Sequence, residues 1–214
     1  MVDLQGGRPV RKDAARNRSA LLDAAGRAFA ALGFDAPLEP IAAAAGLGNA
    51  TLHRHFPTRA ALWEAVLRDP LLEVLDVVTA CEVEPDPWTG LAEYVHRTAA
   101  IEARREGYHS LMTTRFEGAD ELLRIRAAIQ GHVDRIITRA RDAGAVRPDL
   151  ATTDIAMVQL SIARTIEVFR DVAPEVHRRW VDLVLDGLRT PTPGPLSAPP
   201  LLPNQVWRAV MQRT

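Results

Sequence analysis

Apolar residues recur at intervals of three and four along most of the chain, as they do on the buried face of a helix. The clearest stripe lies in residues 14–32 and consists of Leu21, Leu22, Ala25, Phe29 and Leu32. Similar patterns predict further helices over residues 38–45, 49–55, 59–79, 87–105, 108–113, 119–143, 152–172 and 174–188. No segment alternates apolar and polar residues as a half-buried strand does. The pattern therefore predicts an all-α fold of about nine helices.

Turn residues separate the second and third of these helices. The run Gly46-Leu47-Gly48 ends the second one, because glycine adopts the backbone angles of a sharp turn. Asn49 then begins a short helix, Pro57 ends it, and Thr58 stands where the N-cap of the next helix belongs. Two short helices joined by a glycine-containing turn are typical of the DNA-binding helix-turn-helix, whose second helix enters the major groove.

Composition divides the chain into four parts. Residues 1–12 are polar and are expected to form a mobile basic arm. Residues 13–58 form the predicted helix-turn-helix domain, and residues 59–189 form a second helical domain. Residues 190–204 hold six of the 15 prolines, so we expect residues 190–214 to be an extended tail. Pro70 lies inside the helix predicted over residues 59–79 and is expected to bend or break it.

Charge is distributed unevenly along the chain. The formal net charge is −1, which argues against a general polyanion-binding protein. Residues 1–68 nevertheless carry a net charge of +3, and the remaining residues carry −4. This asymmetry favours nucleic-acid contact by the N-terminal part.

Other classes of protein find little support. Cys81 is the single cysteine, so an intramolecular disulfide cannot form and a reducing compartment fits. No apolar run approaches the roughly 20 residues of a membrane-spanning helix, and the charged N-terminus does not resemble a signal peptide. We therefore expect a cytoplasmic protein with no membrane partner. No cluster of residues has metal-ligand or catalytic spacing, so we expect no metal, no cofactor and no enzymatic activity.

The segment from Ala45 to Arg59 reads AGLGNATLHRHFPTR and resembles the DNA-binding domain of TetR-family transcriptional regulators. The preceding residues DAPL, at positions 35–38, are similar to the SbtR-like sub-branch of that family. The resemblance implies a small-molecule effector, which would bind within the second helical domain, and a homodimer made by the last two helices of that domain.

The predicted recognition helix presents side chains suited to DNA. Asparagine pairs with adenine, threonine and alanine contact the thymine methyl group, and arginine reaches guanine or phosphate. The resemblance implies contacts at Thr51 and His53, although the family usually has glycine where Ala50 stands and tyrosine where His53 stands. Histidine is shorter and donates only through a ring N–H, so operator affinity is expected to be lower or pH-sensitive. The predicted DNA-contacting residues are Asn49, Ala50, Thr51, His53, Arg54, Arg59, Arg16 and Lys12.

Some of these residues have a second interpretation. Arg16 and Lys12 would contact phosphate or the minor groove, or else would belong to a solvated tail, and the sequence does not choose between the two. Arg59 is predicted to clamp a phosphate, with an ordinary surface position as the alternative.

The resemblance also implies an effector pocket and a dimer interface. The pocket is expected to be mostly apolar with a few polar groups, and core filling is the alternative for each candidate. Its predicted lining is Trp63, Tyr94, Arg97, Met112, Arg115, Phe116, Met157 and Thr165. The two predicted helices over residues 152–172 and 174–188 are apolar nearly all round, which suits helices buried on both sides, either in a dimer or in a larger monomer. The predicted interface consists of Val158, Ile162, Ile166, Phe169, Trp180, Val181, Val184 and Leu188.

Together these features predict a ligand-responsive transcriptional repressor that binds a near-palindromic operator as a homodimer. Two alternatives remain at this point. One is an activator, or a regulator without a small-molecule inducer. The other is a helical binding protein whose N-terminal domain no longer binds DNA, which the residues at positions 50 and 53 would permit.

Overall fold

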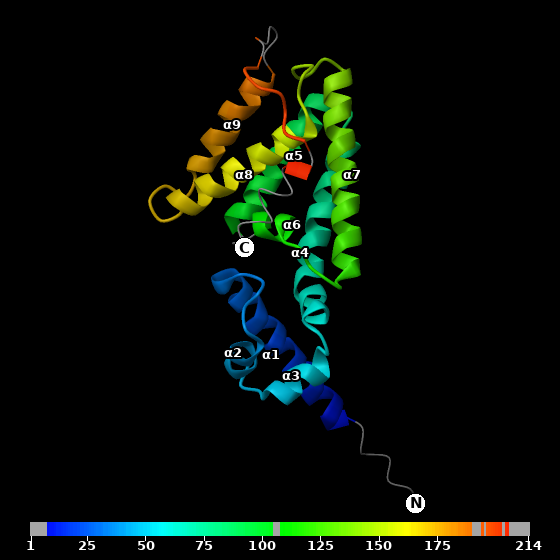
Figure 1. The fold of residues 1–214 in the computed structure, drawn as a ribbon, viewed down its shortest axis with the longest axis vertical. Coiled ribbons are helices and arrows are strands. Elements are labelled where there is room, and N and C mark those ends of the chain that lie inside the picture. Colours follow the sequence, from blue (N-terminus) through cyan, green and yellow to red (C-terminus); the bar gives the residue numbers. More distant parts are fainter. Residues whose placement is uncertain (1–7, 105–107, 190–193, 195, 203, 206–214) are drawn as a thin grey trace, which may run out of the picture. The chain divides into compact units, whose positions relative to one another are not determined.

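The computed structural model describes residues 8–104, 108–189, 194, 196–202 and 204–205, with the side chains of residues 13–104 and 111–189 and of these tail residues. The chain divides into two compact units. The first unit contains the chain up to Pro70 and the segment Phe116–Leu122, and the second contains Leu71–Arg115 and the chain from Leu123 onward. The described residues form helices α1–α9 and no strand, so the all-α prediction is confirmed (Figure 1).

The first unit contains α1 (Arg8–Leu32), α2 (Leu38–Ala44), α3 (Asn49–His55) and the beginning of α4 (Arg59–Glu82). The apolar stripe of α1 packs inward, and Leu21 and Ala25 are fully buried. Gly46 has a φ of +69°, a conformation that residues with a side chain rarely adopt. The turn that it allows brings the Leu47 N–H to the carbonyl of Ala42 at 2.9 Å, which closes the end of α2.

An aromatic cluster completes the first unit. Phe116 is fully buried and packs edge-on against Phe34 and Trp63, with ring centroids 5.1 and 5.2 Å away. Phe34 in turn packs edge-on against Phe29 at 5.8 Å. The indole N–H of Trp63 donates to the carbonyl of Phe34 at 2.9 Å, so the polar atom of this buried ring is satisfied. A segment distant in sequence therefore completes the core of the helix-turn-helix unit.

The second unit contains the rest of α4 with α5 (Pro87–Arg104), α6 (Tyr108–Thr113), most of α7 (Asp120–Asp142), α8 (Thr152–Phe169) and α9 (Val176–Leu188). Helices α8 and α9 pack against each other, and α5 packs against both (Figure 1). No helix of the described residues is long and apolar enough to cross a membrane.

Two helix starts follow the local chemistry. The Thr58 hydroxyl accepts a hydrogen bond from the Ala61 N–H at 3.1 Å, so the predicted N-cap of α4 is confirmed. At the start of α5, the Asp86 carboxylate accepts from the Thr89 N–H and hydroxyl, at 2.9 and 2.6 Å. These bonds from Thr89 lower the pKa of Asp86, because they stabilise the charged carboxylate.

Three expectations about the course of the chain need correction. Helix α1 begins at Arg8, so the backbone of residues 8–12 is helical and not part of a mobile arm. Helix α4 continues through Pro70, so of the expected bend or break the break does not occur. Helix α8 ends at Phe169, where the Ala173 N–H donates to the Phe169 carbonyl in a turn. Most of the proline-rich tail over residues 190–214 lies outside the described residues.

Candidate functional site

Helix α3 has one buried side and one exposed edge. Leu52 is fully buried, and Phe56, which follows the helix, is 2% exposed. Because these two residues hold α3 against the unit, the opposite edge of the helix faces outward. Ala50, His53 and Arg54 are exposed and Thr51 is half-buried. The outward edge of α3 therefore carries four of the residues predicted to contact DNA.

Arg54 lies along its own helix. Its Nε donates to the Ala50 carbonyl at 3.2 Å, and its Nη2 donates to the Thr51 hydroxyl at 3.0 Å. The guanidinium thus fixes the orientation of the hydroxyl beside it. An arginine in this position has further N–H donors available for phosphate or guanine.

Two of the predicted DNA contacts have other surroundings. The side-chain oxygen of Asn49 is buried and has no hydrogen-bond partner among the described residues, so it does not face outward as adenine recognition would require. Arg59 is half-buried, and its Nη1 donates to the carbonyls of Phe34 and Ala36 at 3.2 and 2.8 Å. Arg59 therefore holds the α1–α2 connection, a role that its sequence position did not reveal.

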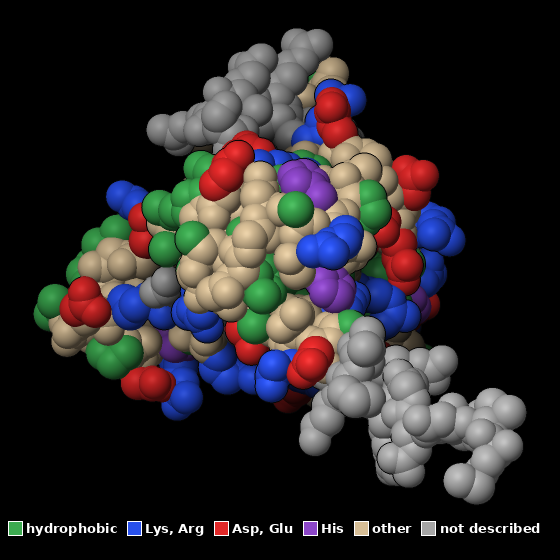
Figure 2. All heavy atoms as spheres, turned by 90° about the horizontal axis from the view of Figure 1, so that it is seen from below, with side chains coloured by type: hydrophobic (Ala, Val, Ile, Leu, Met, Phe, Trp, Pro, Cys, Tyr) green, Lys and Arg blue, Asp and Glu red, His purple; other side chains and the backbone are tan. Residues whose placement is uncertain are grey.

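Helix α1 contributes two more arginines to this unit. Arg16 is exposed and pairs with Asp13 at 3.1 Å. The guanidinium of Arg18 lies 5.3 Å from the ring centroid of Phe56, a cation–π contact that joins α1 to the end of α3. The side chain of Lys12 lies outside the described residues. On the face shown in Figure 2, basic and acidic side chains are interspersed, in keeping with the overall charge of −1.

The residues predicted to line an effector pocket are divided between the two compact units. Trp63 and Phe116 belong to the aromatic cluster of the first unit, and the other six belong to the second. Within the second unit, Met157 is 43% exposed and Arg115 is exposed. Thr165 is half-buried and donates to the Ser161 carbonyl of its own helix at 2.8 Å. The resemblance implies a shared pocket for these residues, whereas the packing of α8 against α5, α6 and α9 leaves the Met157 side chain partly exposed.

Tyr94 is the buried member of the predicted set within the second unit. It is 7% exposed, and burial raises its pKa to about 12 despite a hydrogen bond with Gln159. Gln159 also donates to the Thr98 hydroxyl at 2.8 Å, and that hydroxyl donates to the Tyr94 carbonyl at 2.7 Å. The sequence patterns did not predict this polar link between α5 and α8. The signal that could have indicated it is Thr98, which lies four residues after Tyr94 and therefore on the same buried face of α5.

Arg126 is a second structural residue that the sequence patterns did not predict. It is partly buried on α7 and donates to the carbonyls of Met112 and Thr114 at the end of α6. Burial lowers the pKa of its guanidinium, because the charged form is desolvated. The two carbonyls satisfy this charge, and Arg126 in turn fixes the end of a short helix.

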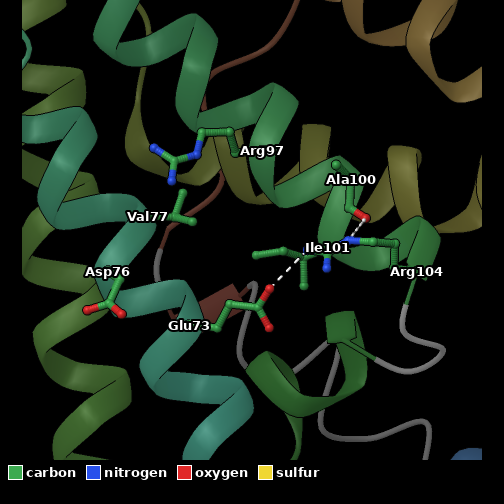
Figure 3. A pocket seen from close by; sticks show the side chains of 7 residues that line it. All are labelled: Glu73, Asp76, Val77, Arg97, Ala100, Ile101 and Arg104. Atoms are coloured by element: carbon green, nitrogen blue, oxygen red, sulfur yellow. Dashed lines mark hydrogen bonds and ion pairs between the residues drawn. The ribbon is translucent and has the colours of Figure 1, made fainter.

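A groove of about 280 Å³ lies between α4 and α5 in the second unit (Figure 3). Of the predicted pocket residues it includes Arg97 alone. Charged side chains from both helices and a few apolar side chains line the groove. The lining residues are Glu73, Asp76, Val77, Arg97, Ala100, Ile101 and Arg104.

The end of α4 is held firmly within the second unit. The Glu82 carboxylate pairs with Arg135, with N–O distances of 2.6 and 3.0 Å, and with the His132 ring. Arg139 donates to the carbonyl of Glu82 and, at 2.8 Å, to that of Glu84. A Cβ on Gly90 would lie 2.6 Å from the Cys81 carbonyl, so only glycine allows α5 to approach this closely.

The pairing of Glu82 predicts an acid-sensitive contribution to stability. Hydrogen bonds from Arg135 and then from His132 lower the pKa of Glu82, so the stabilisation is complete above its unfolded value of about 4.3 and disappears as the pH falls below it. We expect Glu82→Gln to lower the urea midpoint at pH 7 and to have a smaller effect at pH 3.5. Glu93→Gln, at an exposed position of α5, serves as the control. An equal loss at both pH values would contradict this assignment.

The predicted dimer residues divide into two groups. Ile162, Ile166 and Val181 are buried within the unit itself, so the assignment of these three to the interface is corrected. Val158, Val184 and Leu188 are half-buried. Phe169 and Trp180 are 45% and 39% exposed, which leaves them available to a partner.

The helix-turn-helix and its outward edge define the class of this protein as a DNA-binding regulator. Comparison with protein families supports this class. Residues 21–66 match the family model described as bacterial regulatory proteins of the tetR family, and residues 86–190 match the model described as the C-terminal domain of SbtR-like transcriptional regulators.

Solved structures with similar sequences are also TetR-type regulators. A TetR transcription regulatory protein from Mycobacterium vanbaalenii is 30% identical, over 85% of this chain and 100% of that one, with a TM-score of 0.45. A TetR transcriptional regulator from Streptomyces coelicolor is 31% identical, over 82% and 99%, with a TM-score of 0.46. A regulatory protein of the tetR family from Rhodococcus RHA1 is 25% identical, over 82% and 96%, with a TM-score of 0.55. No curated protein matches the chain.

The chain belongs to the TetR family of transcriptional regulators. Members of this family regulate transcription and are not enzymes, so the expectation of a non-enzymatic protein is confirmed.

Proposed function

We propose that this regulator is a repressor that binds a near-palindromic operator as a homodimer and is released by a small-molecule effector. The observation that carries the proposal is the exposed edge of α3, where the side chains of Thr51, His53 and Arg54 face away from the buried Leu52. A helix of this kind reads base edges in the major groove, and its partner reads the second half-site.

Exposed apolar side chains on α8 and α9 support the homodimer. Val168, Phe169, Trp180 and Leu183 are each more than a third exposed. The indole N–H of Trp180 donates to the Ser161 hydroxyl at 3.0 Å, which links the two helices at this surface. Large apolar groups that a protein leaves exposed are typical of protein interfaces. A second copy of the same pair of helices would cover them symmetrically.

The fixed end of α4 supports release by an effector. This helix begins in the first unit and ends at Glu82 in the second, where α5 and α7 hold it. A ligand that displaces the part of α4 farther from Glu82 would move the first unit with it. Two recognition helices must lie about 34–36 Å apart to enter successive major grooves, so a small change of this spacing lowers operator affinity.

The direct test begins with selection of genomic fragments by the full-length protein. We expect enrichment of an inverted repeat, and reporter expression from such a site should fall when the protein is present. Failure to enrich any repeat at low salt would contradict DNA binding itself, while increased reporter expression would contradict repression alone.

Substitutions on α3 test the proposed contacts. Thr51→Ala and Arg54→Ala are each expected to weaken binding to the selected operator by about 1–3 kcal/mol, because each removes a group that reaches base edges or phosphate. Gel-shift titration at one fixed salt concentration measures this loss. Arg178→Ala is the control, since Arg178 pairs with Glu175 at the exposed start of α9. Unchanged affinity in both α3 variants would exclude α3 from the interface.

A further inference from the structure

The groove between α4 and α5 separates its charges by helix. Helix α4 contributes two carboxylates, those of Glu73 and Asp76, and α5 contributes the guanidinium groups of Arg97 and Arg104 (Figure 3). The formal charges of these four side chains cancel. The groove therefore has no net attraction for a simple anion or cation, but its two walls differ in sign.

The two guanidinium groups have different partners. Nη2 of Arg104 pairs with Oε1 of Glu73 at 2.9 Å, so this pair bridges α4 and α5. Arg97 makes no ion pair with a carboxylate of the described residues, and it interacts instead with the Cys81 thiol. Arg97 is exposed, so its guanidinium is available to a ligand.

Apolar side chains lie between the charged ones. Val77 and Ile101 are 6% and 2% exposed, and Ala100 lies beside Ile101 on α5. Their surfaces can contact a small apolar group of a ligand but not a large one. At about 280 Å³, the groove is below the usual range for drug-sized ligands.

We infer that this groove binds a small zwitterion of amino-acid size, whose carboxylate pairs with Arg97 and whose ammonium pairs with the carboxylates of α4. Guanidinium and carboxylate groups match in geometry and form strong charge-assisted hydrogen bonds. A zwitterion places both of its charges on complementary walls, whereas an anion would also meet the carboxylates of α4. The apolar side chain of the ligand would lie against Val77 and Ile101.

A consequence for regulation rests on the proposed function. The ligand ammonium would compete with Arg104 for Glu73, and so would weaken the bridge between α4 and α5. Glu73 lies about two and a half turns of helix before Glu82, the held end of α4. Binding would therefore act on the part of α4 that leads to the first unit.

Calorimetric titration of the full-length protein without DNA tests the inference. Each common amino acid is titrated at millimolar concentration, and at least one with an apolar side chain is expected to bind. The matching acid without the amine and the matching amine without the carboxylate are each expected to bind at least about tenfold more weakly. Arg97→Gln and Asp76→Asn are each expected to weaken binding about tenfold to a hundredfold, and Arg178→Gln is expected to leave it unchanged.

Two results would overturn the inference: no amino acid binds, or Arg97→Gln binds the amino acid as tightly as the original protein. Operator release is measured separately by gel shift. Amino-acid binding that depends on Arg97 but does not release DNA would support the groove and contradict effector release. Release by other compounds without amino-acid binding would support the proposed function and contradict the groove.

Discussion

Phe116→Ala is expected to destabilise the first unit by about 3–5 kcal/mol, the usual cost of removing a buried phenylalanine side chain. Phe116 is fully buried and lies edge-on to both Phe34 and Trp63. Its loss leaves a cavity that these two rings cannot fill without moving. Because Trp63 donates to the Phe34 carbonyl, such movement would also strain a buried hydrogen bond.

Hydrogen exchange under native conditions is the suitable measurement, because it reports the stability of α1 and of the beginning of α4 separately from the second unit. Leu32→Ala is the control within the same unit, since Leu32 is 67% exposed and its truncation should change stability by no more than about 0.5 kcal/mol. Equal protection in the two variants would show that the aromatic cluster does not stabilise the helix-turn-helix.

Leu183→Arg is expected to weaken dimerisation by about a hundredfold or more, because the proposed interface would bury an unpaired charge. Leu183 is 52% exposed on α9, so the substitution should not disturb the core of the unit. Operator affinity should fall with it, since each monomer would then contact a single half-site.

Sedimentation velocity measures the first effect, and gel-shift titration measures the second. Val83→Arg introduces the same charge at an apolar residue that is 74% exposed near the end of α4, and it is expected to leave both the dimer and operator binding intact. A dimer that survives Leu183→Arg would exclude this surface of α9, and a protein that is monomeric without any substitution would contradict the homodimer altogether.

The sequence determined the local features of this protein. Apolar periodicity located all of the helices that the described residues contain, and Gly46 and Thr58 marked turns and caps whose hydrogen bonds involve near neighbours. The resemblance of residues 45–59 to one family was equally local, because a recognition helix is a short contiguous segment. These features depend on backbone conformation within a few residues, which neighbouring side chains largely decide.

Only the tertiary structure decided which side of each helix is covered and by what. It placed Phe116 beside Trp63, turned Arg59 toward backbone carbonyls and buried Ile162, while leaving Trp180 in solvent. The groove has the same origin, since Glu73 and Arg104 meet across two helices although they are 31 residues apart. Periodicity shows that a residue lies on an apolar face, but burial depends on the shape of distant segments that pack against that face, and a single sequence does not specify this directly.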